Sequence, residues 1–197
     1  MTYTAIFGGT FNPFHIGHYG VLAALQKANF VEEVLLTPDR IPPHKTCDFL
    51  ASDEDRIEMC RIAAADFSKA QLCLAEFERA EKSYSYITVR RLTERCPDVR
   101  FALVFGADML VTLDQWKNYR ELIETVTFIV FRRAGTDNAL FNERVAHFEK
   151  MGAKIIVMGE ELANISSGEI RKNFEELRHL LPEKIASYLA GRGIYNG

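Results

Sequence analysis

Residues 4–18 read TAIFGGTFNPFHIGH, and this stretch decides how the rest of the chain is interpreted. Its first part, Thr4–Phe7, is a short apolar run that Gly8 and Gly9 stop, which is typical of a buried strand. From Ile16 to Ala28, apolar residues recur at helical spacing. The stretch therefore predicts a strand, a glycine-rich turn and a helix in direct succession.

The rest of the chain repeats this alternation. The further strands that we expect are Val31–Thr37, Gln71–Ala75, Val99–Phe105, Val126–Phe131 and Lys154–Met158. The further helices are Ser52–Ala65, Tyr86–Arg95, Tyr119–Glu124, Ala139–Met151, one from about Gly168, and a last helix that Pro182 opens and Gly191 ends. Such alternation predicts an α/β fold, a mostly parallel sheet with helices on both faces, whose ligands bind where the strand order reverses. No Pro/Gly/Ser-rich linker divides the chain, so we expect a single domain over residues 1–197.

Composition excludes several classes of protein. The 24 Lys+Arg residues nearly balance the 27 Asp+Glu residues, which argues against a protein that coats nucleic acid. The cysteines form no C-x-x-C pair, so we expect neither a zinc site nor a disulfide framework; they are Cys47, Cys60, Cys73 and Cys96. The chain has no signal-peptide pattern and no run of 18 apolar residues. We therefore expect a soluble cytoplasmic protein with no membrane contact.

The glycine-rich turn has the composition of a phosphate cradle. Gly8 and Gly9 allow a ligand to approach backbone N–H groups closely. His15 and His18 are three residues apart, so their rings can point the same way, and we expect Gly17 between them to leave space for an anion. The N-terminus of the following helix adds the positive end of its dipole.

The two common nucleotide motifs do not fit this turn. A dinucleotide fingerprint needs a second glycine where Thr10 stands, and no Gly-Lys-Ser/Thr follows as a P-loop would require. The alternative is an ordinary glycine-rich turn that carries two surface histidines. Two histidines, three glycines and a proline in a single turn make the cradle the better interpretation.

A second motif, Ile165–Arg171, reads ISSGEIR and offers a further phosphate site. The hydroxyls of Ser166 and Ser167 at a helix start can hold a phosphate, and Arg171 adds a planar fork of donors one turn later. Taken alone, the motif fits an ordinary serine N-cap followed by an exposed arginine. Its pairing with the first motif favours phosphate binding.

Three further features follow strands and point to a second ligand. The loop Pro42–Lys45 combines a rigid Pro-Pro with two potential cations, Trp116 can stack on a flat ligand, and Asp108 can accept hydrogen bonds from ribose hydroxyls. The alternatives are a stiff surface loop, an indole that caps the core and an N-cap carboxylate. Arg132-Arg133, after another strand, are weaker candidates for phosphate contact, and the segment Glu76–Lys82 fits a solvated polar loop.

The first motif resembles that of the nucleotidyltransferase superfamily, which includes the pantetheine-phosphate and nicotinate-nucleotide adenylyltransferases. The combination of Pro42–Lys45, the segment Ser83–Val89 and Gly106-Ala107-Asp108-Met109 with Trp116 resembles the bacterial nicotinate-mononucleotide adenylyltransferase family over nearly the whole chain. Ile165–Arg171 resembles the second signature of the superfamily, in which Thr is usual at the position of Gly168, and an Asp is usual at the position of Asn12. The bacterial family's own segment SYT-x-DTL has a Thr where this chain has Ser85 and an Asp where it has Ile87. The resemblance implies a Rossmann-like nucleotidyltransferase fold.

The resemblance also implies a reaction, in which nicotinate mononucleotide and ATP give deamido-NAD and pyrophosphate. His15, His18 and Arg171 would be the catalytic residues, and Mg²⁺ would come with ATP. The implied ATP-binding residues are Gly8, Gly9, Thr10, Phe11, His15, His18, Ser166, Ser167 and Arg171. The implied acceptor-binding residues are His44, Lys45, Ser85, Asp108, Trp116 and Lys117.

Two other functions stay open from the sequence. One is a sister transferase that uses nicotinamide mononucleotide or pantetheine phosphate, and the other is a nucleotide-binding sensor without catalysis. Intact His15, His18 and Arg171 argue against the sensor, because binding alone does not require both histidines. The sequence does not decide whether the chain forms a homo-oligomer.

Overall fold

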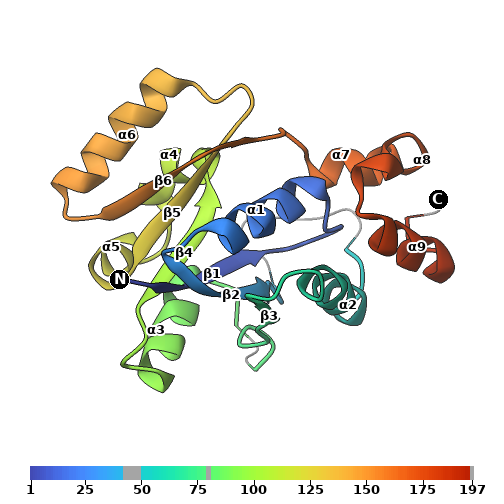
Figure 1. The fold of residues 1–197 in the computed structure, drawn as a ribbon, viewed down its shortest axis with the longest axis horizontal. Coiled ribbons are helices and arrows are strands. Elements are labelled where there is room, and N and C mark those ends of the chain that lie inside the picture. The colour runs from blue at the N-terminus through green and yellow to red at the C-terminus, as the bar shows by residue number, and fades with distance from the viewer. Residues whose placement is uncertain (42–49, 79–80, 196–197) are drawn as a thin grey trace.

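The computed structural model describes residues 1–41, 50–78 and 81–195 and centres on a six-stranded parallel sheet (Figure 1). The strands are β1 Tyr3–Gly9, β2 Val31–Pro38, β3 Ala70–Leu72, β4 Phe101–Gly106, β5 Thr127–Arg133 and β6 Lys154–Leu162. They lie in the order β3-β2-β1-β4-β5-β6, and every neighbouring pair is parallel. This is the strand order of the doubly wound Rossmann fold, which confirms the predicted fold class.

The order of the strands reverses between β1 and β4. From β1 the chain builds outward through β2 and β3, and then returns to add β4, β5 and β6 on the other side. Phe7 of β1 lies opposite Val104 of β4, while Gly9 lies opposite Pro38 of β2. The glycine-rich turn and the end of β4 therefore meet at the point where such sheets bind ligands.

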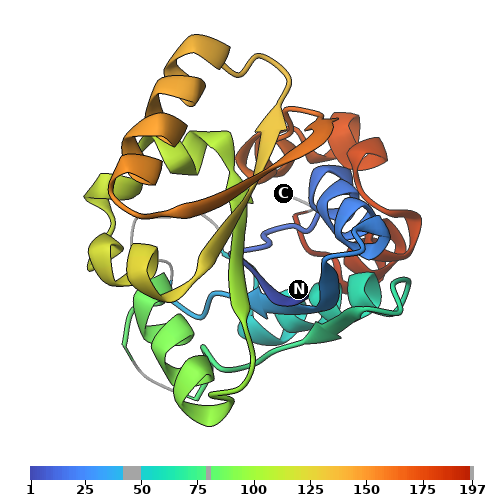
Figure 2. The ribbon, with the colours of Figure 1, turned by 60° about the vertical axis from the view of Figure 1, so that its left-hand side comes forward.

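Helices cover both faces of the sheet (Figures 1 and 2). One buried cluster joins the sheet to α1 Ile16–Lys27, α2 Asp53–Ala64, α7 Ser167–Lys172, α8 Phe174–Leu177 and α9 Glu183–Arg192. The other joins it to α3 Ser85–Arg95, α4 Ala107–Val111, α5 Tyr119–Thr125 and α6 Asn138–Lys150. Two short 3₁₀ turns, η1 Leu113–Gln115 and η2 Arg178–Leu180, complete the described elements. None of the described helices is long and apolar enough to cross a bilayer.

The central strands are buried on both faces, so adjacent residues belong to different clusters. In β1, Phe7 packs in the cluster with α1 while Ile6 packs in the cluster with α3. In β4, Val104 and Leu103 divide in the same way. This alternation follows from the period of two along a strand, and it gives the ligand edge two sides.

The observed elements differ from the predicted ones mainly at three places. β6 continues to Leu162 instead of ending at Met158, because Glu161 and Leu162 pair with the end of β5 after a register shift. β3 contains only Ala70–Leu72. The last helix continues past Gly191, where it was predicted to end, to Arg192, and Gly193, whose φ of 65° is left-handed, is its C-cap.

Candidate functional site

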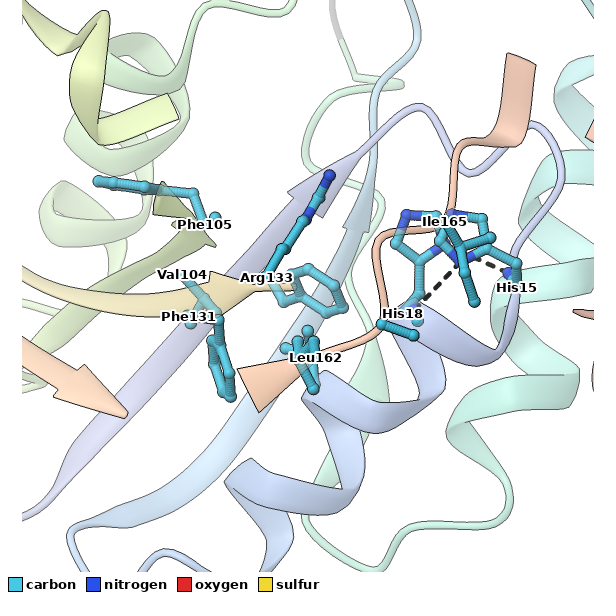
Figure 3. Close-up of a pocket in the computed structure, with 13 residues that line it drawn as sticks. His15, His18, Val104, Phe105, Phe131, Arg133, Leu162 and Ile165 are labelled. Atoms are coloured by element: carbon cyan, nitrogen blue, oxygen red, sulfur yellow. Dashed lines mark hydrogen bonds between the residues drawn. The ribbon is translucent and has the colours of Figure 1, made fainter. Parts of the chain in front are cut away.

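Two pockets lie at the carboxyl edge of the sheet, one on each side of the central strands. The first, here called the α1-side pocket, comprises about 390 Å³ and is lined by Phe7, His15, His18, Val104 and Arg133, among others (Figure 3). The second, the α3-side pocket, comprises about 290 Å³ and has Ile6 and Leu103 at its base. Because neighbouring residues of β1 and β4 point to opposite faces, the two pockets approach the same sheet edge from opposite sides.

The His15 and His18 rings are stacked, with centroids 3.7 Å apart and planes inclined by 16°. The Nδ1 atom of His15 accepts from the backbone N–H of His18 at 3.4 Å, and the Nδ1 atom of His18 accepts from the backbone N–H of His15 at 3.2 Å. His15 is therefore the N-cap of α1, and His18 lies in the first turn of the helix. Since a backbone N–H can only donate, neither Nδ1 atom carries a proton in this arrangement, and each neutral ring has its proton on Nε2.

Gly17 lies between the two histidines in the lining of the α1-side pocket. A Cβ atom at this position would lie 3.0 Å from Cε1 and Nδ1 of His15, so the missing side chain also makes room for the His15 ring. The glycine thus permits the stacked pair, which faces the pocket (Figure 3). That Gly17 also leaves space for an anion stays a prediction.

An aromatic layer supports the histidines from below. Phe11 is 2% exposed and has a φ of 48°, and its ring contacts those of Phe7 and Phe14 with centroids 5.4 and 5.2 Å away. The His18 ring meets the Phe11 ring in a T-shaped contact at 5.0 Å. The side chain of Phe11, predicted as an ATP-binding residue, is thus buried in the core, and only its backbone groups can serve a ligand.

The second motif docks against the first, although more than 150 residues separate them along the chain. The Oγ atom of Ser166 caps α7 by accepting from the N–H of Gly168 at 3.2 Å. Ser167 donates its hydroxyl to the carbonyl of Pro13 at 2.9 Å, and Arg171 donates from Nη1 to the carbonyl of Asn12. The structure therefore brings the two predicted motifs together and joins them through backbone carbonyls.

The end of β4 contributes a third group to this edge. Gly106 precedes α4, and a Cβ atom there would collide with the Oδ1 atom of Asp108 and lie 3.3 Å from Nε of Arg133. Nη1 of Arg133 lies 3.8 Å from Oδ2 of Asp108, whose side chain is 56% exposed. Arg133 extends into the α1-side pocket opposite the histidines (Figure 3), whereas Arg132 is not among the residues that line it. The two arginines were equal candidates for phosphate contact in the sequence, and only Arg133 lines the pocket.

The α3-side pocket is assembled from several segments. Its polar lining is Thr37, Asp39, Glu76, Ser83, Ser85 and Thr88. The Oγ atom of Ser83 accepts from the backbone N–H groups of Arg40 at 3.1 Å and Ile41 at 3.2 Å, which holds the start of α3 beside the end of β2. Of the predicted acceptor residues, Ser85 lies in this pocket.

Glu76 is the residue of this pocket that sequence reasoning missed. It was assigned to a solvated loop, but it is 3% exposed and accepts a hydrogen bond from Oγ1 of Thr88. The signal was its position between Ala75, which is buried, and Phe77, which packs beneath a guanidinium. In this chain a carboxylate thus reaches Thr88 from Glu76, while the neighbouring position holds Ile87.

The remaining predicted acceptor residues line neither pocket or lie outside the described residues. Trp116 is half-buried, and its indole packs against the Phe105 ring with centroids 5.5 Å apart. Lys117 places Nζ 4.7 Å from the centroid of the Tyr84 ring. His44 and Lys45 lie outside the residues that the structure describes.

A protein-held metal site has no support in the described part of the chain. Within residues 1–41, 50–78 and 81–195, no three His, Cys, Asp or Glu side chains come together as metal ligands. The α1-side pocket offers imidazole and guanidinium, which suit phosphate better than Mg²⁺. A magnesium ion that enters with a nucleotide would therefore be held mainly by phosphate oxygens and water.

The sheet order, the histidine pair at the start of α1 and the docked ISSGEIR motif define a nucleotide-binding α/β protein of the nucleotidyltransferase type. A family profile described as cytidylyltransferase-like matches residues 6–173. With that match and the relatives below, the chain belongs to the nicotinate-nucleotide adenylyltransferase family of nucleotidyltransferases.

The relatives cover nearly the whole chain. A protein of Halalkalibacterium halodurans named "Probable nicotinate-nucleotide adenylyltransferase" is 36% identical over 199 residues, covering 99% of this chain and 92% of that protein. One of the same name from Bacillus cytotoxicus is 34% identical and covers 99% of each. The solved nicotinic acid mononucleotide adenylyltransferase of Plasmodium falciparum, complexed with NaAD, superposes with a TM-score of 0.78 at 20% identity, covering 100% of this chain and 98% of that one. At that identity the superposition supports the fold alone.

Proposed function

We propose that this protein transfers the AMP part of ATP to nicotinate mononucleotide, giving deamido-NAD and pyrophosphate. The observation that carries the proposal is the stacked histidine pair, whose Nε2–H donors serve a pocket directly across the sheet edge from a second pocket. The names of the relatives support the choice of donor and acceptor.

ATP occupies the α1-side pocket in this proposal. His15 and His18 donate from Nε2 to the phosphates as charge develops on the transferring phosphorus, and the N-terminus of α1 adds its dipole. Ser166, Ser167 and Arg171, which follow Ile165 of the pocket lining, hold the β and γ phosphates, and the backbone of Gly8–Phe11 contributes N–H groups. Because reciprocal hydrogen bonds fix the two rings, these donors are positioned before the substrate arrives.

Nicotinate mononucleotide occupies the side of the edge that leads to the α3-side pocket. Its pyridine ring stacks on the exposed face of Trp116, and backbone N–H groups near Ser85 and Lys117 donate to its carboxylate. Asp108 accepts hydrogen bonds from ribose hydroxyls, and His44 and Lys45 attract the acceptor phosphate. Glu76 orients Thr88 in the same segment, which supplies a carboxylate where the family has an acid at the position of Ile87.

The chemistry requires no general base. An oxygen of the acceptor phosphate attacks the α phosphorus of ATP, the bond from that phosphorus to the bridging oxygen breaks, and pyrophosphate leaves with the electron pair. The nucleophile is already an anion at neutral pH, so the protein's task is to align two anions and to neutralise the spreading charge. Mg²⁺ bound to ATP would supply part of that neutralisation.

The proposal is tested by incubating the purified protein with ATP, Mg²⁺ and one acceptor at a time. The acceptors are nicotinate mononucleotide, nicotinamide mononucleotide and pantetheine phosphate, with pyrophosphate and the adenylated product both quantified. We expect the nicotinate compound to give the fastest turnover. Pyrophosphate release with either of the other acceptors alone would assign the protein to a sister activity, and ATP binding without turnover would identify a sensor.

A further inference from the structure

One fully buried cation lies beneath the site and has no part in the mechanism above. Arg56 of α2 has a side chain that is 0% exposed. Its Nη1 atom donates to the carbonyl of Thr10 at 3.3 Å and to the carbonyl of Asp39, and its Nη2 atom donates to the carbonyl of Arg40 at 3.3 Å. Asp53, one turn earlier in α2, forms an ion pair with Nη2.

These carbonyls belong to the two segments that carry the two halves of the site. Thr10 lies in the glycine-rich turn after β1, and Asp39 and Arg40 directly follow β2. Around them, the N–H of Asp39 donates to the carbonyl of Gly9 at 2.9 Å. The guanidinium therefore connects the turn of the α1-side pocket with the segment that leads into Pro42–Lys45.

A buried guanidinium is an expensive way to fill this space. Burying a charge is unfavourable, and even where the charge is paired and hydrogen-bonded, an apolar side chain of similar volume is often as stable or more stable. Nε of Arg56 also lacks a hydrogen-bond partner among the described residues. Packing alone thus does not account for an arginine here, whereas an arrangement of several donors around backbone carbonyls does.

We propose that Arg56 is a positioning residue. It fixes the spacing between the glycine-rich turn at Thr10 and the segment Asp39-Arg40 that follows β2, so that the α phosphorus of ATP and the attacking phosphate oxygen of the acceptor meet. This inference rests on the proposed function. It places Arg56 outside both ligand pockets and acting only through the backbone of Thr10, Asp39 and Arg40.

Lysine cannot replace arginine in this role. The bonds divide between two nitrogens of a planar fork, whereas a lysine ammonium places all its donors on a single atom. Misplacing reacting groups by about 1 Å reduces rates by roughly a hundredfold. We therefore expect Arg56→Lys to lower kcat by about ten- to a hundredfold while the two substrates still bind singly.

The experiment compares Arg56→Lys with wild type and with Arg61→Lys. Arg61 lies on the same helix and has the same i, i+3 pairing with an acid, Glu58, but its side chain is 58% exposed. For each folded protein, turnover is measured with ATP and nicotinate mononucleotide, and calorimetry gives the affinity for each substrate alone. We expect both affinities of Arg56→Lys to stay within about threefold of wild type, and Arg61→Lys to match wild type throughout.

Two results would overturn the proposal. One is a kcat of Arg56→Lys close to that of wild type, and the other is a loss of affinity for one substrate that accounts for the whole loss of turnover. If Arg56→Lys does not fold, Asp53→Asn decides instead, because it removes the carboxylate that orients the guanidinium and leaves the carbonyl bonds. A smaller fall in kcat with both affinities retained supports the proposal, and an unchanged kcat contradicts it. Inactive wild-type protein would refute the proposed function and not the role of Arg56 specifically.

Discussion

The two pockets at the sheet edge differ in charge and in construction. Among the described residues, the lining of the α1-side pocket includes His15, His18 and Arg133 and no carboxylate. The α3-side lining includes Asp39 and Glu76 and no cationic side chain within the same described ranges. The first pocket can hold a polyanion by itself, whereas the second must obtain its cations from the rim if an anionic acceptor is to bind.

This difference in charge and construction indicates which substrate each pocket would bind. The α1-side donors are fixed by reciprocal hydrogen bonds within four residues of sequence, so they are ready for the charge that develops in the transition state. The α3-side groups come from several segments, and in the proposal they determine which acceptor binds. Substitutions on the first side should therefore affect turnover most, and substitutions on the second should affect acceptor affinity.

The largest expected effect is on the α1 side. His18→Ala removes a donor that acts mainly in the transition state, so kcat should fall by roughly a hundredfold, equivalent to about 3 kcal/mol, with little change in acceptor affinity. Steady-state kinetics with both substrates check this, with His179→Ala, an exposed histidine, as the control. Unchanged kcat in a folded His18→Ala protein would remove the histidine pair from the mechanism.

The next largest effect concerns the choice between two acceptors and is measured on the wild-type protein. We expect kcat/KM for nicotinate mononucleotide to exceed that for the amide by at least about tenfold, or roughly 1.4 kcal/mol. A carboxylate accepts charge-assisted hydrogen bonds from backbone N–H groups, while the amide presents an NH₂ donor to those same donors. Equal values would mean that Ile87, despite the bond from Thr88 to Glu76, marks a change of substrate.

A smaller effect distinguishes binding of the acceptor from binding of ATP. Trp116→Ala should raise KM for the acceptor about fivefold, because an aromatic stack contributes roughly 1 kcal/mol. The affinity for ATP should remain near that of wild type, and Trp116→Phe, which keeps a ring, should retain most of the acceptor affinity. Calorimetry that assigned the loss to ATP would place the adenine, not the pyridine, on this indole.

The smallest expected effect is on stability and concerns Asp55 of α2, which forms hydrogen bonds with α9. Burial raises the pKa of Asp55, but hydrogen bonds from Ser52, Tyr188 and Arg192 outweigh it and leave the pKa below its ordinary value. A lowered folded-state pKa stabilises the protein above the unfolded pKa near 4, and this contribution is lost as the pH falls through the folded pKa.

Asp55→Asn should therefore lower the melting temperature by about 3 °C at neutral pH, the shift expected for roughly 1 kcal/mol in a chain of this size. The gap to wild type should close as the pH falls below about 4. Thermal melts across that range measure it. A gap of constant size at every pH would show that Asp55 contributes through packing and not through its charge.

The sequence predicted well the features that depend on residues close together along the chain. The turn, both histidines and the ISSGEIR helix start depend on neighbouring residues, and the sheet and helix pattern followed from apolar periodicity. The interpretation failed at Glu76, which depends on a contact with another element. Glu76 is buried beside α3, where Thr88 donates a hydrogen bond to its carboxylate.

Arg56 shows the same limit more clearly. In sequence it belongs to an acidic first turn of an ordinary amphipathic helix, where an arginine is usually solvated. Its burial becomes evident only when α2 packs against the ends of β1 and β2, which lie far apart along the chain. Local patterns therefore predicted the histidines that line the α1-side pocket, but not the buried arginine behind the glycine-rich turn.

In the proposed complex the two substrates bind on opposite sides of the sheet edge. A crystal structure with a non-hydrolysable ATP analogue and nicotinate mononucleotide would show whether they do. We predict that the phosphates lie against Nε2 of His15 and His18, and that the pyridine ring lies on Trp116 with its carboxylate at the N–H groups near Ser85. Adenine on Trp116, or the mononucleotide phosphate alone between the histidines and Arg171, would mean that the substrates are not divided in this way.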